Sequence, residues 1–586
     1  MKRIVYFIVA AVMLMGCEDF LEQKPLTQKT SANYPQTAED AKQMMAGIYT
    51  TMNNAQRFVD KSYFFVNEVA SDEKLGGGGV NDLNAQAVEN FMYDEPEMLD
   101  HAWEQKYEGI YRANYAIENL ETLSDEVVSP EQKDQYKGEA LFLRAWFYFQ
   151  LASLFEEVPL TTSSKAENLP AATPEELYGQ MASDLKEAIE IMPQVPYNQI
   201  EEGRATRWAA QALMARIYLF YTGFYNKDAL PLADGGSVPK SDVIDWLSDC
   251  INNSGHQLVD DFYELWPYTN SATLADTASM EFSYIKEYMK ETGKDLTYAC
   301  DQGARSPETM FAIKFSHFSD WGVQRGYSNQ YQLYFALRGL QPLENTYPYA
   351  GGWGQGNSIP ETVVEQWQQD EPNDPRLWAS VIDIEKELIP QGYERGKWDF
   401  VMESDYWGRK YNGVTARGDD GSLKNDYSVV QAGNNDNNQL SHNDDLIYIR
   451  YADVLLMMSE LTQDVSYMNQ VRERAGLDPL GSYSVEALRE ERRHELAFEG
   501  LRWNDMRRWG DAYAKNALES QVGVPVYNFG EATTHQPLSP KGYSQRYDET
   551  RGFFPIPQSQ IDISNGQLEQ IDGYKNGNGL YNGWSN

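Results

Sequence analysis

The spacing of apolar residues predicts two blocks of amphipathic helices. In the first block, Ala140, Leu143, Phe147, Leu151 and Leu154 recur at intervals of three and four residues, the period of a helix with a buried face. That helix begins near residue 135. The same period predicts helices over residues 37–54, 99–123, 174–192, 206–225, 444–462, 484–499 and 503–519.

Between about residues 255 and 443 the helical period fades, and Gly, Pro, Asn and Tyr become frequent. Short β-prone fragments such as residues 310–315 stand in this stretch. We therefore expect a mainly α protein with a loop-rich insertion that holds short strands. The expected helix pairs, at intervals of about 34 to 40 residues, resemble tetratricopeptide-type hairpins.

This division predicts one body over residues 17–586, preceded by a signal peptide over residues 1–16. Its helical scaffold covers residues 30–254 and 444–525, the ligand-facing insertion covers about 255–443, and a C-terminal loop segment covers 526–586.

Composition limits the partners of this body. The 586 residues include 88 Asp and Glu against 49 Lys and Arg, a net charge of −39, yet 42% are hydrophobic and 13% aromatic. That apolar content is too high for a disordered acidic chain, so we expect a large core. The negative charge would repel nucleic acid and anionic lipid surfaces. A neutral polar ligand fits the balance better.

The N-terminus indicates export. Lys2 and Arg3 precede an apolar run over residues 4–15, which is too short to span a bilayer and suits a signal peptide. The run ends in Leu14-Met15-Gly16-Cys17, which resembles a bacterial lipobox. We expect cleavage before Cys17 and acylation of its thiol, so that acyl chains are the membrane anchor of the protein.

Two further cysteines, Cys250 and Cys300, could be bridged in an oxidising compartment or left as two thiols. We expect them to be unbridged, because a large core needs no covalent staple.

Signatures of catalysis and metal binding are missing from the sequence. There is no Gly-x-Ser-x-Gly elbow, no P-loop and no histidine or cysteine pair at zinc-ligand spacing. Asn434, Asp436 and Asn438 alternate like calcium ligands but lack the loop Gly and the distal Glu, which favours an ordinary turn over a structural calcium site. A glycosidase needs only two placed carboxylates, so a surface glycoside hydrolase stays as an alternative.

The charged run over residues 488–496 invites a catalytic or nucleic-acid interpretation. We expect instead a helix laced with ion pairs, since Glu490 and Arg493 stand three residues apart and Leu488 and Leu496 supply apolar anchors.

Tryptophans form two groups. Those on the predicted helices are expected in the core, and they are Trp103, Trp146, Trp208, Trp246, Trp503 and Trp509. Seven others lie in the loop-rich insertion, where binding residues tend to concentrate: Trp266, Trp321, Trp353, Trp367, Trp378, Trp398 and Trp407.

Several blocks together resemble the SusD/RagB family of lipid-anchored glycan-binding proteins of Bacteroidetes outer membranes. They follow one another in the family's order along the whole chain. The blocks are Cys17-Glu18-Asp19-Phe20-Leu21-Glu22, Asn67-Glu68-Val69-Ala70-Ser71-Asp72-Glu73, residues 103–119, Arg144-Ala145-Trp146-Phe147-Tyr148, Ala205-Thr206-Arg207-Trp208-Ala209-Ala210, Ile449-Arg450-Tyr451-Ala452-Asp453-Val454-Leu455-Leu456, residues 492–510, and Phe554-Pro555-Ile556-Pro557 with Gly573-Tyr574.

The resemblance implies a SusD-like fold without catalysis or cofactor. It also implies a glycan ligand and a partner, a SusC-like TonB-dependent transporter over which the protein sits as a lid. Glu18 and Asp19 beside the anchor resemble the surface-export signal of such lipoproteins, which implies a protein facing the cell exterior. A peptide-binding member with the same lid architecture is a further alternative.

Candidate ligand residues follow from composition and position. Asp72, Lys74, Asn81 and Asp82 flank the run Gly76-Gly77-Gly78-Gly79, which we expect to be a flexible loop, and they match the family segment that borders the ligand surface. The insertion contributes Tyr298, Trp321 and Trp353, because sugar rings stack on aromatic faces while polar side chains hold the hydroxyls.

Overall fold

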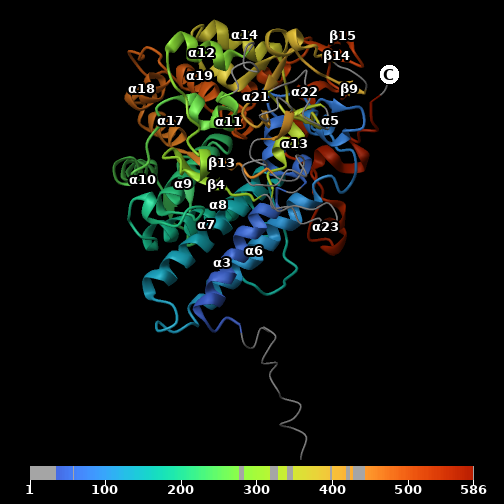
Figure 1. Ribbon diagram of the computed structural model, residues 1–586. Coiled ribbons are helices and arrows are strands. Elements are labelled where there is room, and N and C mark those ends of the chain that lie inside the picture. Colours follow the sequence, from blue (N-terminus) through green and yellow to red (C-terminus); the bar gives the residue numbers. More distant parts are fainter. Residues whose placement is uncertain are drawn as a thin grey trace, which may run out of the picture.

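The computed structural model describes residues 34–56, 58–275, 283–316, 328–338, 348–395, 399–417, 423–426 and 442–584 (Figure 1). Cys17 and the expected signal segment lie outside these residues. Within the described residues, no helix is both long enough and apolar enough to cross a membrane.

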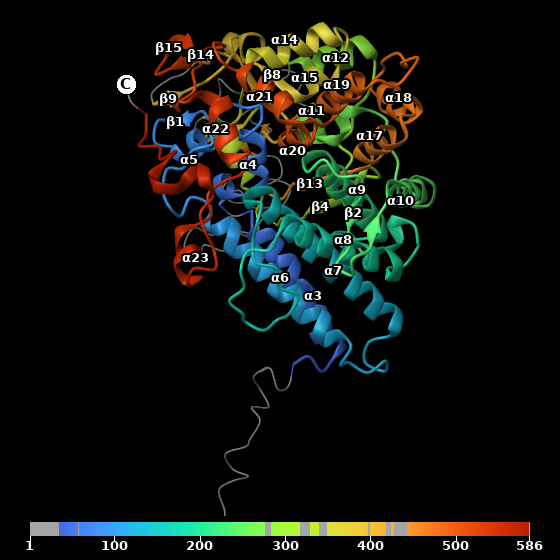
Figure 2. The same ribbon diagram turned by 180° about the vertical axis from the view of Figure 1, so that it is seen from behind.

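The N-terminal half is a succession of helices in which each one contacts the next. They are α3 (Ala38–Asn54), α6 (Asp100–Leu120), α7 (Pro130–Phe155), α8 (Pro174–Ile191), α9 (Arg207–Phe224) and α10 (Lys240–Asn253). The first five match the predicted helices within a few residues at each end, except that α7 begins earlier, and α10 was not predicted. Paired packing of successive helices confirms the mainly α, tetratricopeptide-like scaffold (Figures 1 and 2).

Local sequence explains where these helices begin. Thr37 and Thr173 accept hydrogen bonds from the backbone three residues on and complete capping boxes, and Ser129 caps α7 in the same way. Close packing fixes one glycine. A Cβ on Gly109 of α6 would lie 2.3 Å from the ring of Phe147 in α7, so only glycine permits this approach.

The second helical block comprises α17 (Tyr451–Thr462), α18 (Val465–Arg474), α19 (Val485–Leu496), α20 (Arg502–Arg508) and α21 (Asp511–Glu519). Two predicted helices were too long. Residues 446–450 are strand β13 (Leu446–Arg450), whose alternating apolar residues are buried against β4 (Thr309–Ile313). The predicted 503–519 helix is broken at Gly510, whose φ of 111° lies outside the helical region.

The insertion contains the expected short strands, together with short helices that were not predicted. The fragment predicted at residues 310–315 is β4. Strand β10 (Tyr406–Gly408) lies between β7 (Ser358–Ile359) and β8 (Val381–Asp383), and β1 (Gly78–Gly79) pairs with β9 (Phe400–Val401). The longer helices of the insertion are α12 (Tyr284–Thr292) and α14 (Glu361–Asp370).

Beyond residue 526 the expected loop segment contains two helices, α22 (Gly542–Thr550) and α23 (Gln558–Ile563). The remaining short elements are α4 (Tyr63–Val69), α5 (Leu83–Glu89), α11 (Ser271–Ala275), α13 (Tyr331–Phe335), α15 (Arg376–Ser380), β2 (Leu230–Pro231), β3 (Ser237–Val238), β5 (Leu337–Arg338), β6 (Gly351–Gly352), β11 (Thr415–Arg417), β12 (Leu423–Asp426), β14 (Pro525–Asn528) and β15 (Glu531–Thr534).

The charged run of residues 488–496 forms α19, and its ion pairs lie inside the protein. Arg376 donates to Glu491 at 2.5 Å and to Glu495 at 2.9 Å, and all three side chains are buried. Arg450 adds contacts to Glu499 and to Glu308. These ion pairs join α19 to α15 and, through Arg450 and Glu495, to β13. Arg493, which was expected to pair with Glu490 along the helix, contacts Asp72 at 3.1 Å instead.

Other expectations about the core are also resolved. Cys250 and Cys300 are free thiols, as predicted, and burial raises the pKa of Cys250 to about 12. Trp103, Trp146, Trp208 and Trp503 are buried as expected. Trp246 and Trp509 are half-buried.

Candidate functional site

Asp72, the first candidate ligand residue, lies in the interior. It is 2% exposed and accepts hydrogen bonds from Arg502 Nε at 2.7 Å and from Arg493 Nη2 at 3.1 Å. Burial would raise the pKa of its carboxyl, but the two guanidinium groups together hold that pKa well below its ordinary value. Asp72 therefore links the segment after α4 to α19 and α20, and its side chain does not reach a ligand surface.

Lys74 is buried in the same region. Its Nζ lies 2.7 Å from Glu68 and 3.9 Å from the centre of the Phe335 ring, and the residue is 1% exposed. The side chain is occupied by a carboxylate and an aromatic face. The structure thus gives Lys74, like Asp72, a role in holding the fold.

The four glycines are buried and do not form the exposed loop that the sequence suggested, and the last two of them are strand β1. Gly78 and Gly79 pair with Val401 and Phe400, and both glycines are buried. A Cβ on Gly79 would lie 2.5 Å from the guanidinium of Arg338. Glycine is present here because other parts of the chain approach the backbone closely.

Asp82 and Trp353 lie around Arg338 and Asp399, and we call these four residues the Arg338 cluster. Arg338 donates to Asp399 at 2.9–3.1 Å and to the backbone oxygen of Trp353 at 2.7 Å, and its Nη1 is 3.6 Å from Asp82. Asn81 is exposed at the turn before α5. The guanidinium thus connects three segments that are far apart in the sequence.

The side chains of the Arg338 cluster are fixed but accessible. Asp82 accepts a 2.6 Å hydrogen bond from the backbone N–H of Gly79, and burial raises the pKa of its carboxyl. The side chain of Asp399 is 45% exposed, and that of Arg338 is 30% exposed. Anchored polar groups that still face solvent can hold the hydroxyls of a ligand without losing much side-chain entropy.

Trp353 supplies an aromatic face at this place. Trp353 follows strand β6, which pairs with β5, and its backbone N–H donates to Leu333 O at 2.7 Å. The indole is half-buried, and its ring centre lies 4.7 Å from that of Tyr334.

Sequence reasoning missed Arg338 and Asp399. Neither belongs to a motif, and they stand 61 residues apart in the chain. The only signal is that each is a polar residue beside a short apolar run, Tyr334-Phe335-Ala336-Leu337 for Arg338 and Phe400-Val401 for Asp399. Many other polar residues share that feature, so it does not single out these two.

Several other aromatic residues of the insertion are buried, although the sequence suggested that they could face a ligand. Tyr298 is 7% exposed, and burial raises its pKa well above the ordinary value, so it belongs to the interior. Trp266, Trp367 and Trp407 are at most 1% exposed and are core residues despite their place in the insertion. Trp321 and Trp398 lie outside the described residues.

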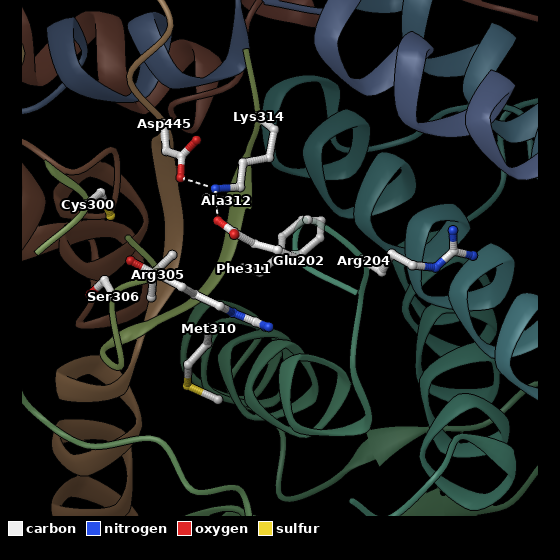
Figure 3. Close-up of a pocket in the computed structure, with 12 residues that line it drawn as sticks. Glu202, Arg204, Cys300, Arg305, Ser306, Met310, Phe311, Ala312, Lys314 and Asp445 are labelled. Atoms are coloured by element: carbon white, nitrogen blue, oxygen red, sulfur yellow. Dashed lines mark hydrogen bonds and ion pairs between the residues drawn. The ribbon is translucent and has the colours of Figure 1, made fainter. Parts of the chain in front are cut away.

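A polar cavity beside β4 offers little room for a ligand. Figure 3 shows Lys314 pointing between Glu202 and Asp445, and its Nζ is 2.6 Å from Asp445. The cavity measures about 30 Å³, enough for a water molecule or two. This ion-paired cluster is part of the packing between the insertion and the scaffold.

Among the described residues, no group of three His, Cys, Asp or Glu side chains is placed to hold a metal ion. The alternating triplet Asn434, Asp436 and Asn438 lies outside the described residues, so the calcium alternative stays a prediction.

Two family models match the chain. Residues 19–219 match the model described as "Starch-binding associating with outer membrane", and residues 345–574 match the model of the SusD family. Among curated relatives, SusD-like protein P2 of Formosa agariphila is 24% identical over 557 residues, covering 89% of this chain and 94% of the relative. A SusD-like protein of Bacteroides ovatus is 22% identical and covers 87% of this chain and 82% of its own length.

Solved structures share the fold. A laminarin-binding SusD-like protein superposes with a TM-score of 0.66 at 20% identity, covering 92% of this chain and 100% of that one. Surface glycan-binding protein A from Bacteroides thetaiotaomicron, solved in complex with laminarihexaose, has the same TM-score and coverage at 19% identity. At these identities the likeness establishes the architecture.

Proposed function

Because the chain belongs to the SusD/RagB family, we propose that it is a cell-surface glycan-binding lipoprotein that captures oligosaccharides and delivers them to a SusC-like TonB-dependent transporter. The observation that carries the binding function is the Arg338 cluster. It brings together Trp353, whose indole is half-buried and whose backbone oxygen accepts from Arg338, and a guanidinium and carboxylates that are held in position yet accessible.

This combination suits a sugar. The C–H face of a pyranose stacks on indole, and carboxylate, amide and guanidinium groups exchange hydrogen bonds with its hydroxyls. Asp82 and Asp399 outnumber the single cation, which disfavours anionic glycans at this place. The proposed ligand is therefore a neutral glycan, and laminarin is the first probe because it is bound by a protein of the same fold.

The test compares Trp353→Ala with Trp378→Ala. Trp378 is a matched control, because it is also half-buried in the insertion and stacks on Tyr284 with ring centres 4.2 Å apart. Calorimetry with laminarihexaose, and gels containing neutral polysaccharides, should show about tenfold weaker binding for Trp353→Ala alone. Equal affinities of the two variants and the wild type for a bound glycan would remove Trp353 from the site.

The hydrolase alternative makes a different prediction at the same cluster. A glycosidase would use two carboxylates, and Asp82 and Asp399 are the pair that faces Arg338. We propose that they bind without catalysis. Release of reducing ends by the purified protein, abolished in Asp399→Asn, would establish the hydrolase instead.

The anchor and the transporter are proposed from the sequence and the family. Acylation at Cys17 predicts that labelled fatty acid enters the wild-type protein and not Cys17→Ala, which should be released from the outer membrane. Purification of the tagged protein from outer membranes should recover a TonB-dependent barrel. Recovery without any such partner would argue against the lid model.

A further inference from the structure

A cavity of about 360 Å³ lies between α6, the segment over residues 159–169, and the end of the chain around α23. Figures 1 and 2 both show α23 at the same end of the molecule as α3 and α6, whereas β9, which borders the Arg338 cluster, lies toward the other end, beside β1 in Figure 2. We call this cavity the α6–α23 pocket. It is separate from the proposed ligand surface.

Two aromatic rings line the pocket from successive turns of α6. The ring centres of Trp103 and Tyr107 lie 5.2 Å apart. Trp103 is 4% exposed and packed in the core, and the Tyr107 hydroxyl donates to Pro159 O at 2.7 Å. Both rings are therefore fixed before any ligand arrives, which lowers the entropy cost of binding.

Polar side chains and one exposed apolar side chain complete the lining. Glu104 on α6 and Gln560 on α23 contribute hydrogen-bonding groups from opposite elements. Asn168 donates to Ser564 O at 2.9 Å and so ties the 159–169 segment to the turn after α23. Ile563 is 68% exposed, the most exposed large hydrophobic side chain among the described residues. Apolar surface beside fixed polar groups is typical of a small-molecule site.

Charge narrows the class of ligand. The described residues that line the pocket include the carboxylates of Glu104 and Glu167 but no Lys, Arg or His. A phosphate, sulfate or uronate would meet only like charge there, and nothing would compensate for its desolvation. A neutral polyhydroxyl compound can donate hydrogen bonds to the carboxylates and place its C–H groups on the partly exposed Tyr107 ring and on Ile563.

We propose that the α6–α23 pocket is a second binding site for one or two units of a neutral glycan. The proposal rests on the glycan-binding function proposed above and adds a site to it. A long polysaccharide could engage both sites of one molecule, which would raise its apparent affinity over that of a short oligosaccharide.

The experiment uses the full-length protein in four forms: wild type, Trp353→Ala, the double variant Glu104→Ala/Gln560→Ala, and the control Val485→Ala. Glu104 is exposed and Gln560 is half-buried, so their truncation should leave the fold intact, and Val485 is an exposed residue at the start of α19. Each form is run through native gels containing a panel of neutral polysaccharides that starts with laminarin, and is titrated with laminarihexaose in a calorimeter.

The double variant has lost two hydrogen-bonding groups. We therefore expect it to bind about tenfold more weakly to whichever polysaccharide retards the wild-type protein in the gel. A second site also predicts that Trp353→Ala, in which the α6–α23 pocket is unchanged, keeps a second binding step in the titration. Wild-type retention and stoichiometry in the double variant would overturn the second site while the proposed function stands. A wild-type protein that binds no polysaccharide of the panel would instead refute the glycan-binding function itself.

Discussion

Lys106 offers a sharp test of the buried electrostatics. It lies on α6, is fully buried, and its Nζ has no hydrogen-bond partner among the described residues. Burial lowers the pKa of its ammonium group from 10.5 to about 7. Replacement by methionine keeps the length and volume of the side chain and removes the charge.

The magnitude follows from the lowered pKa. At 1.36 kcal/mol for each tenfold change in proton affinity, a fall from 10.5 to about 7 costs about 4 kcal/mol of folding free energy at pH 7. The unfolded chain binds the proton more tightly, so the cost is full below pH 7 and shrinks as pH rises toward 10.5. We expect Lys106→Met to stabilise the protein by about 4 kcal/mol at pH 7 and by about 2 kcal/mol at pH 9.

Urea unfolding followed by tryptophan fluorescence measures this difference at each pH. Lys42→Met is the matched control, because Lys42 is an exposed lysine on α3, the helix that contacts α6. The control should shift the unfolding midpoint little and equally at both pH values. A Lys106→Met variant that is no more stable than the wild type, or whose gain is independent of pH, would refute the reasoning.

Three further predictions concern the interior. Burial raises the pKa of Glu73 from 4.5 to about 7, so the stability of the folded protein should fall as pH rises from 4.5 to 7. The loss is about 3 kcal/mol at pH 8, and Glu73→Gln should remove it in urea titrations between pH 4.5 and pH 8. Arg376→Met leaves three buried carboxylates without their shared cation, and calorimetric unfolding should show a loss of about 3–5 kcal/mol; unchanged stability would contradict the network's role. Gly109→Ala should destabilise by about 1–3 kcal/mol because its Cβ would collide with Phe147, and the control Gly481→Ala, with open space at its Cβ, should have little effect on the denaturation midpoint.

The helical scaffold could be predicted from the sequence because the signals that define a helix lie within the helix and at its ends. Apolar period and capping residues such as Thr37 and Thr173 define each helix without reference to the rest of the chain. The prediction failed where the tertiary context overrides the period. Residues 446–450 pair with β4 to form a strand, although the apolar residues around them also fit a helix.

The candidate site could be predicted only in part. The sequence indicated Asp82 and Trp353, which the structure brings together at Arg338, and Asn81, which is exposed in the turn before α5. It also indicated Asp72 and Lys74, which are buried in ion pairs. A charged residue is predicted to be exposed unless its ion-pair partner is known. One partner of Asp72 is Arg502 in α20, which stands 430 residues away in the sequence.

The sequence by itself determined the class of this protein: an acidic, aromatic-rich, mainly helical chain whose ordered blocks identify its family. Only the tertiary structure decided which of its aromatic and charged residues are buried and which remain exposed to solvent. Periodicity specifies which side of an element is apolar, but burial depends on what covers that side. Trp407 is fully buried and Trp353 only partly buried, and the residues next to them in the sequence do not predict this difference.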